Sequence, residues 1–349
     1  MDWRCQIESI GVKFPGNKLT TPEIMEKLKI PCIKKFGLLT GISERKVCSS
    51  GEDSFSLAVD AAKDCLSFSK YRADELDMII NCSITKYKDG LSHLYEPTFS
   101  TLIKNAVGAR KALSFDISNA CAGMMTGVYV AEKFIRQGII KTCMIVSGEY
   151  ISNICDHAIK NIKTSLSSEL SSLTLGDCGA AAIIERSADE KNGLIVSGFT
   201  TLSKYSNLCI GRQSRNTPGG SMKTKAKEIH QAAIYESVPI LKEALNKSNL
   251  SINEINWLIP HQTSRSSIIS GANHYLECFG EKPGQIVINL KETGNTASTT
   301  HFLALYRYLN KKRFNENDIV MLLCFASGLI IGVVIFKMNK MVHRYGNIN

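Results

Sequence analysis

Residues 121–149 read CAGMMTGVYVAEKFIRQGIIKTCMIVSGE, and residues 295–328 read NTASTTHFLALYRYLNKKRFNENDIVMLLCFASG. Both segments begin with small residues, continue through a helical pattern, cross a basic turn and end in an apolar strand. Two copies of one long pattern indicate a duplicated structural unit. The sequence therefore predicts a protein built from two related halves.

The second copy runs into the most apolar stretch of the chain, residues 319–336. This stretch, IVMLLCFASGLIIGVVIF, carries no charge and is long enough for a membrane-spanning helix. Two buried antiparallel strands joined near FASG fit its pattern as well. Its counterpart in the first copy, residues 142–147, has only the length of a strand. We therefore expect two core strands and no membrane span.

Strand and helix patterns alternate along the whole chain. The expected strands are residues 5–12, 76–85, 113–117, 142–149, 194–197, 255–260 and 285–289. The expected helices are residues 54–68, 97–107, 121–137, 228–245, 264–277 and 296–309. This alternation implies an α/β fold with a parallel-type sheet, whose active residues lie in loops at the carboxyl ends of strands.

The composition is that of a globular protein, with 44% hydrophobic and 21% charged residues. Twelve cysteines are spread along the chain without a CxxC pair or a zinc-like spacing with histidine. The N-terminus, MDWRCQIESIGVKF, lacks the long apolar core of a secretory signal. We expect free thiols, a reducing cytoplasmic location and no metal cluster.

The formal net charge is +10, which raises the question of a nucleic-acid partner. The basic residues are scattered and are not interleaved with aromatic residues, so we do not expect nucleic-acid binding. The densest group lies in a polar loop and consists of Arg212, Arg215, Lys223, Lys225 and Lys227. This group is either a solvated loop or a surface for an acidic protein or a phosphate-bearing molecule.

Three polar residues follow expected strands, which is where an α/β fold carries its chemistry. Cys121 opens a helical pattern, His261 directly follows INWLIP, and Asn295 follows QIVIN after a short loop. A helix N-terminus and a nearby imidazole would lower the pKa of the Cys121 thiol and prepare it to attack a thioester. Singly, a cysteine or a histidine is more often structural; the three together indicate a catalytic site.

The flanking residues resemble a known family. NACAG around Cys121, IPHQTSR around His261 and GNTAS around Asn295 are similar to the three active-site motifs of the beta-ketoacyl-ACP synthase III group of the thiolase superfamily. GISER (41–45), TLGDCGAAAII (174–184) and SGLIIG (327–332) also resemble segments of that group. The resemblance implies a five-layered αβαβα thiolase fold. Each chain would consist of two halves, residues 1–186 and 187–349, and two chains would form a cytoplasmic homodimer.

The resemblance also implies roles for individual residues. Cys121 would accept the acyl group, while His261 and Asn295 would donate hydrogen bonds to the thioester carbonyl of the second substrate. The backbone N–H groups of Cys121 and Gly328 would form the other oxyanion hole. Acyl-CoA or acyl carrier protein thioesters would be the substrates, with no bound cofactor and no metal.

Glu96, in YEPT (95–98), narrows the resemblance to a subgroup. Olefin-pathway condensing enzymes and pyrone-forming ketosynthases carry a glutamate in a similar motif, where it acts as a base across the dimer interface. A malonyl donor makes its carbanion by losing CO₂, whereas an ordinary acyl thioester must lose an α proton to a base. A carboxylate in an apolar tunnel has a raised pKa suited to that task. The alternative is that Glu96 is a solvated loop charge.

Some positions depart from the family pattern. The CoA-binding tryptophan and arginine of the group are replaced by Lys35 and Leu39. The residues after the catalytic histidine motif are Ser264, Arg265 and Ser266, of which we expect Ser264 and Arg265 to contact substrate. These departures favour a carrier protein as the donor.

We therefore expect a ketosynthase that condenses two acyl thioesters without decarboxylation. Three alternatives remain at this level. The first is a decarboxylative synthase that uses malonyl-ACP, and the second is an acyltransferase that forms an ester or an amide. The third is an inactive subunit that supports an active partner, which the intact cysteine, histidine and asparagine argue against.

Overall fold

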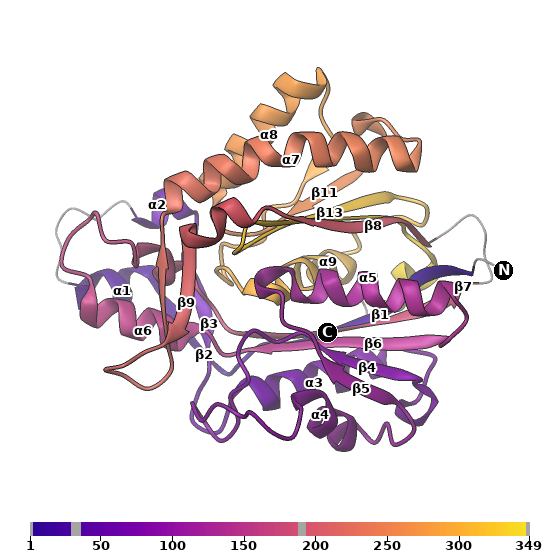
Figure 1. Ribbon diagram of the computed structural model, residues 1–349, viewed down its shortest axis with the longest axis horizontal. Helices are drawn as coiled ribbons and strands as arrows, with labels where there is room; N and C mark the ends of the chain where they lie inside the picture. The colour runs from indigo at the N-terminus through magenta and orange to yellow at the C-terminus, as the bar shows by residue number, and fades with distance from the viewer. Residues whose placement is uncertain (1–2, 29–35, 188–192, 347–349) are drawn as a thin grey trace.

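The computed structural model describes residues 3–28, 36–187 and 193–346, so Lys35 lies outside the described residues. Two five-stranded sheets form the centre of the molecule (Figure 1). In spatial order, the first sheet contains β1 (Arg4–Lys13), β7 (Cys178–Ser187), β6 (Thr142–Glu149), β4 (Met78–Asn81) and β5 (Leu113–Asp116). The second contains β12 (Gln285–Ile286), β11 (Trp257–Pro260), β13 (Ile319–Ala326), β14 (Ile330–Lys337) and β8 (Gly193–Thr201).

Both sheets are mixed, which corrects the expectation of a parallel-type sheet. In the first, β4 runs parallel to β5 and β6, while β7 is antiparallel to β6 and β1. In the second, β11 runs parallel to β12 and β13, while β14 is antiparallel to β13 and β8. Each sheet keeps three adjacent parallel strands, whose carboxyl ends meet at one edge. The loops after β5, β11 and β12 therefore still converge.

The two sheets sandwich a pair of helices, α5 (Gly123–Arg136) and α9 (Thr300–Asn310). One apolar cluster joins residues of both helices to residues of both sheets. The outer layers are α3 (Ser54–Ser67) and α4 (Phe99–Val107) on one side, and α7 (Ala226–Ser248) and α8 (Arg265–Phe279) on the other (Figure 1). These five layers confirm the expected αβαβα thiolase fold. The proposed division at residue 186 remains a prediction.

The long apolar run forms β13 and β14, which pair antiparallel from Ile319↔Lys337 to Ala326↔Ile330. The prediction of two core strands is therefore confirmed. Within the described residues, no helix combines the length and apolar character needed to cross a membrane.

Several small elements at one end of the molecule were not predicted from the sequence. They are α1 (Thr21–Leu28), α2 (Phe36–Thr40), α6 (Ser152–Asn161) and two pairs of antiparallel strands. One pair is β2 (Asn17–Thr20) with β3 (Glu44–Val47), and the other is a hairpin of β9 (Cys209–Gln213) and β10 (Gly220–Thr224). Their strands are short and mostly polar, so the periodicity that marks a core strand is weak in them.

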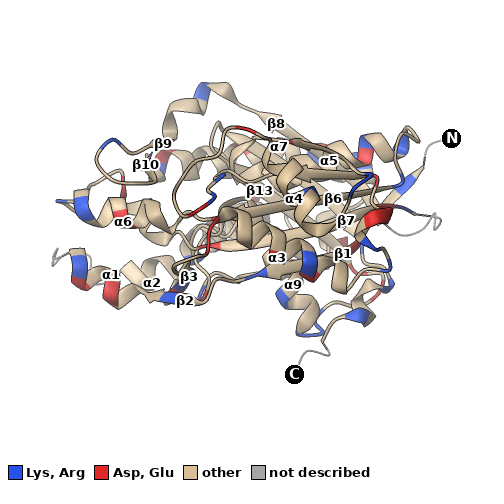
Figure 2. Ribbon diagram, turned by 90° about the horizontal axis from the view of Figure 1, so that it is seen from below, with Lys and Arg blue, Asp and Glu red and all other residues tan. Residues whose placement is uncertain are grey.

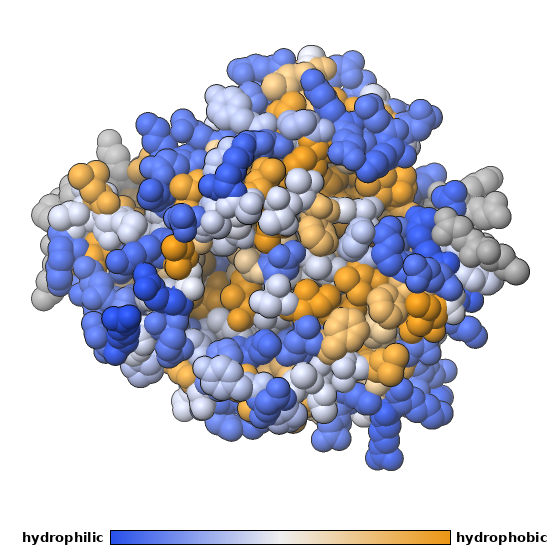
Figure 3. All heavy atoms as spheres, viewed as in Figure 1, coloured by the Kyte–Doolittle hydropathy of each residue, from blue (hydrophilic) through white to orange (hydrophobic). Residues whose placement is uncertain are grey.

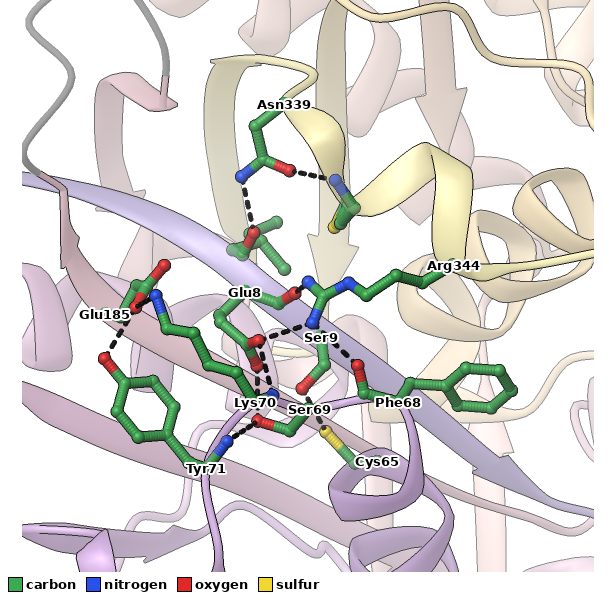
Figure 4. Close-up of polar contacts among 12 residues, drawn as sticks. Glu8, Ser9, Cys65, Phe68, Ser69, Lys70, Tyr71, Glu185, Asn339 and Arg344 are labelled. Atoms are coloured by element: carbon green, nitrogen blue, oxygen red, sulfur yellow. Dashed lines mark hydrogen bonds and ion pairs between the residues drawn. The ribbon is translucent and has the colours of Figure 1, made fainter.

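The C-terminal segment is tied back to the first sheet (Figure 4). The Arg344 guanidinium donates to the Glu8 carboxylate at 2.5 Å and to the Phe68 carbonyl at 2.7 Å. The Tyr345 hydroxyl donates to the Ile10 carbonyl at 2.7 Å and accepts from its N–H at 2.6 Å. These contacts join the last described residues to β1 and to the end of α3, so the two halves share one core.

Charged residues are dispersed over the surface. Figure 2 shows Lys and Arg interspersed with Asp and Glu over the view that it presents. The basic residues of the 212–227 segment are all exposed on or beside the β9–β10 hairpin. In Figure 3, apolar side chains gather across the middle of the face that it shows, between the outer layers.

Candidate active site

Cys121 lies in the junction between β5 and α5. Ala120 to Ala122 form a single 3₁₀ turn, and Ala120 adopts a left-handed φ of 46°. The α-helix begins only at Gly123. A Cβ on Gly123 would lie 2.5 Å from the Cys82 carbonyl oxygen, so this residue type lets the helix start against β4. Cys121 is the middle residue of the 3₁₀ turn and is half-buried.

The environment of the Cys121 thiol corrects the expectation of a lowered pKa. Burial raises the pKa of the thiol, and the nearby Cys209 and Glu149 side chains raise it further. The helix N-terminus is two residues further along the chain than the sequence pattern suggested, and it does not offset these effects. The resting thiol is therefore protonated, and its proton must leave as the thioester is attacked.

His261 directly follows β11 and is only 3% exposed. Its backbone N–H donates to the Leu323 carbonyl at 2.9 Å. The next residue, Gln262, braces the loop by donating to the Pro260 and Val287 carbonyls at 2.7 and 3.0 Å. Burial, together with the neighbouring His301, lowers the pKa of His261 to about 3. A neutral imidazole suits the expected role of hydrogen-bond donor.

Asn295 sits in the loop between β12 and α9 and is half-buried. Its backbone N–H donates to the Thr174 carbonyl, and its own carbonyl accepts from Gly176, at 2.9 and 3.0 Å. The side-chain Oδ1 accepts from the Ala297 N–H at 3.0 Å. This bond orients the amide so that its NH₂ group can serve as a donor to a ligand.

The three predicted residues come together through a few shared neighbours. The Cys324 thiol, at the end of β13, donates to the Cys121 carbonyl at 3.5 Å and lies beside His261. Leu175 and Ala297, which flank the backbone of Asn295, belong to the apolar cluster against which Cys121 packs. The fold thus gathers the loops carrying Cys121, His261 and Asn295 at one place.

His301 is a member of this group that the sequence motifs did not reveal. It is the second residue of α9 and is fully buried, with its Nε2 atom 3.1 Å from the Leu323 carbonyl. Its ring centroid lies 5.7 Å from that of His261, and burial lowers its pKa to about 4. The one available signal was a histidine six residues beyond Asn295, in a chain with seven histidines.

A buried carboxylate supports the Asn295 loop. Glu149, at the end of β6, accepts from the Ser298 hydroxyl at 2.5 Å and from the Ser147 hydroxyl at 3.0 Å. It also accepts from the backbone N–H groups of Ile84 and Thr85. Burial raises the pKa of Glu149 despite these four donors. Because Ser298 lies three residues beyond Asn295, this hydrogen-bond network holds the Asn295 loop against the end of β6.

The other predicted residues lie at the edges of the site. Gly328 is in the turn between β13 and β14, with φ 139° and a cis bond to Leu329. Ser264 caps α8, and its hydroxyl accepts from the Ser267 N–H at 3.1 Å, so it has a structural role as well. Arg265 is exposed at the first position of α8, and its side-chain carbons pack against Gly41.

Glu96 is exposed in the loop that leads into α4. Within the described part of the chain, its carboxylate makes no hydrogen bond or ion pair. Among the described residues no bond joins Glu96 to the group around Cys121, and its role as a base stays a prediction. The start of α4, just after this loop, is bonded to β5, since the N–H groups of Phe99 and Ser100 donate to Asp116 at 3.2 and 2.9 Å.

Comparison with known proteins identifies the family. Residues 115–202 match the family profile of 3-oxoacyl-(acyl-carrier-protein) synthase III, and residues 245–338 match the profile of its C-terminal region. Together these matches span more than half of the chain. The chain belongs to the beta-ketoacyl-ACP synthase III-like family of the thiolase superfamily. It is an acyltransferase of the condensing-enzyme type.

Individual relatives are similar along almost their whole length. Beta-ketoacyl-(acyl-carrier-protein) synthase III of Clostridium novyi (strain NT) is 29% identical, over 97% of this chain and 100% of the relative. The solved synthase III of Aquifex aeolicus VF5 superposes with a TM-score of 0.81 at 23% identity, covering 95% of this chain and 99% of that one. OleA of Xanthomonas campestris gives a TM-score of 0.83 at 20% identity, covering 97% and 99%.

Proposed function

We propose that this synthase III-like enzyme joins two acyl thioesters by a Claisen condensation without decarboxylation. The Cys121 thiol attacks the first thioester, forms a new C–S bond and displaces the CoA or carrier thiol, which takes up the proton. The second thioester then loses its α proton to Glu96 of the partner subunit. The resulting enolate attacks the acyl carbon, and Cys121 leaves as a thiolate that recovers the proton from Glu96.

The observation that carries the proposal is the convergence of the Cys121, His261 and Asn295 loops. A buried neutral imidazole and an oriented amide are two donors suited to a developing enolate oxygen. On the other side of the acyl carbon, the backbone N–H groups of Cys121 and Gly328 would stabilise the tetrahedral intermediate. The turn around Cys121 packs against β13 and β14, on either side of Gly328, which supports this pairing.

The position of the Glu96 loop supports a role across a dimer interface. β5 is an edge strand of its sheet, and Leu113 on it is 59% exposed. An open edge of this kind is a ready site for pairing with a second chain. The start of α4, which follows the Glu96 loop, is bonded to Asp116 on the same strand, and β5 leads directly into the Cys121 turn. Pairing through β5 would therefore carry the Glu96 loop of each subunit toward the other active site.

Relatives suggest the class of substrate. A variant of OleA from Xanthomonas campestris has been solved with lauric acid and lauroyl-CoA bound. We propose that this chain likewise takes fatty acyl thioesters. The exposed basic residues of the β9–β10 hairpin would suit an acidic carrier protein as donor. Met222 of the same hairpin packs in the apolar cluster that borders Cys121, which connects this surface to the site.

A second candidate function is decarboxylative condensation with malonyl-ACP. It is favoured by the curated relatives, which carry the name beta-ketoacyl-(acyl-carrier-protein) synthase III. In that reaction the carbanion arises by loss of CO₂, so no base is required and Glu96 would be dispensable.

The deciding experiment compares wild type, Glu96→Ala and Glu281→Ala with acyl and malonyl thioesters. Glu281 is a second exposed carboxylate and serves as the matched control. We expect all three to load acyl groups on Cys121 by intact-protein mass. Only wild type and Glu281→Ala should condense two non-malonyl units. Full condensation by Glu96→Ala with malonyl donors alone would instead establish the decarboxylative reaction.

Mixed dimers test whether Glu96 acts in the neighbouring subunit. In a dimer of one Cys121→Ala chain and one Glu96→Ala chain, the second chain keeps Cys121 and receives Glu96 from the first. Random mixing should restore about a quarter of the wild-type rate, because half of the dimers are mixed and each has one complete site. If Glu96 acts within its own chain, no mixed dimer has a complete site and no activity returns.

A further inference from the structure

His261, His301 and Cys324 form a cluster of potential metal ligands, which the condensation does not need. Each residue offers a ligand atom, and the three atoms lie within 4.8 Å of one another. All three side chains are buried, and they arrive from the end of β11, the start of α9 and the end of β13. Sequence spacing gave no sign of this arrangement, since the residues are separated by 40 and 23 positions along the chain.

Two nitrogens in the cluster have unmet hydrogen-bonding capacity. The Nδ1 atoms of His261 and His301 are buried, and neither has a partner among the described residues. The carbonyl of Leu323 can only accept, so the His301 Nε2 atom must carry the proton in the bond between them. His301 Nδ1 is then a bare lone pair. A buried polar atom left without a partner destabilises the fold, and a bound ligand would satisfy it.

The chemistry of these atoms fits a soft divalent metal ion. Two imidazoles and a thiolate are a donor set that Zn²⁺ prefers, at distances of about 2.0 Å to nitrogen and 2.3 Å to sulfur. A tetrahedral ion would hold such donors about 3.3–3.8 Å apart, so side-chain movements on the order of 1 Å would close the cluster.

We propose that the synthase binds one Zn²⁺ ion per chain at His261, His301 and Cys324, and that this ion inhibits the enzyme. On binding, the Cys324 thiol gives its proton to solvent and forms the S–Zn bond. The bond that the thiol donated to the Cys121 carbonyl is lost at the same time. Because the loss of this bond releases the turn that holds Cys121 and its N–H group, acyl transfer to Cys121 stops, and the metal also withdraws His261 from the second thioester.

The test uses the full-length, metal-stripped enzyme in a reductant that does not bind metals, titrated with Co²⁺ as a spectroscopic substitute. Wild type should bind one equivalent and develop the intense visible bands of tetrahedral Co²⁺ with a thiolate charge-transfer band. His301→Phe and Cys324→Ser should each weaken binding at least about a hundredfold. The control Cys65→Ser, a buried thiol on α3, should bind as wild type does.

Cys121→Ala separates the two candidate sulfur ligands. The proposal requires this variant to keep the charge-transfer band and Cys324→Ser to lose it; the reverse result would overturn it. X-ray absorption of wild type loaded with Zn²⁺ gives a measurement that needs no substitution. It should show two imidazoles and one sulfur, and a shell of oxygen and nitrogen alone would refute the site.

Acyl loading of Cys121 provides the last test of the proposal. Stoichiometric Zn²⁺ should abolish acyl loading of wild type, and a chelator should restore it. Tight Zn²⁺ binding with undiminished loading would exclude a site beside Cys121. This readout concerns only the loading of Cys121, so it is independent of whether Glu96 is the base.

Discussion

The turns that open α5 and α9 have similar backbone conformations, but their central side chains lie in different environments. Ala120 and Ala297 both adopt a left-handed φ, of 46° and 51°, and each lies in a single 3₁₀ turn that leads into a helix between the sheets. The next residue is Cys121 in the first turn and Ser298 in the second. Cys121 is half-buried at the site, whereas Ser298 is fully buried and hydrogen-bonded to Ser147 and Glu149.

This difference shows that equivalent positions in the two halves can serve different purposes. The shared turn places one side chain at the same point in each half. In the first half that side chain is the half-buried thiol that we propose as the nucleophile, and in the second it anchors the loop that carries Asn295. The strained alanine is kept in both, so the turn geometry is needed for placement and not for the thiol chemistry alone.

The largest effect should come from giving the first turn the residue of the second. Cys121→Ser keeps the turn but replaces a strong nucleophile with a weak one. We expect acyl loading, measured by intact-protein mass over time, to fall on the order of a thousandfold or more. Cys65→Ser should load normally. Appreciable loading of Cys121→Ser would mean that another residue accepts the acyl group.

The second prediction concerns residues 175–177, a segment that contacts both turns through Leu175. Asp177 follows Leu175 and Gly176, and its buried carboxylate accepts from the N–H groups of Cys48, Ile151 and Ser152. Asp177→Asn should destabilise the fold, because the new NH₂ group would face one of these donors. Urea unfolding of wild type and variant in parallel measures the difference.

The pH dependence of that difference follows from the pKa of Asp177. Burial raises it from 3.8 to about 6, so the folded state holds the proton more tightly than the unfolded state does. The stabilisation from this group is complete below about pH 4 and is lost as the pH rises through about 6. Between pH 4 and pH 6, the difference in free energy of unfolding between wild type and Asp177→Asn should narrow by on the order of 2 kcal/mol. A gap that widens instead would contradict the raised pKa.

A smaller effect should follow from loosening each turn separately. Ser298→Ala removes the bond to Glu149, and Thr126→Ala removes the bonds that tie α5 to Asn119 and to the Ala122 carbonyl. Each should lower the free energy of unfolding by about 1–2 kcal/mol. Ser298→Ala should slow condensation more than loading, and Thr126→Ala should slow loading. Equal effects on both steps would argue against separate roles for the turns.

The smallest effect should come from relieving the strain common to both turns. Ala120→Gly and Ala297→Gly each remove a Cβ from a left-handed position, which favours the fold, but each also adds freedom to the unfolded chain. We expect changes in unfolding free energy within about 1 kcal/mol, of the same sign at both sites. Thermal unfolding is the measurement, and opposite signs would mean that the two backbones are not equivalent.

The sequence by itself determined the architecture and the three motif residues. Alternating patterns and the repeated unit predict the two halves, and Cys121, His261 and Asn295 can be found because each follows a strand pattern. Local signals were also sufficient for details such as the Asp53 cap of α3, whose carboxylate accepts from the Ser56 N–H. Such features depend on neighbours within a few residues, which a sequence displays directly.

Tertiary structure alone decided the electrostatics and the remaining members of the site. The pKa of Cys121 is raised and not lowered, because burial by distant segments outweighs the local effect of the helix. His301 and Cys324 carry no motif, and they meet His261 only because α9, β13 and β11 pack together. Burial and proximity arise from residues far apart in the chain, and for that reason no pattern of spacing could have indicated them.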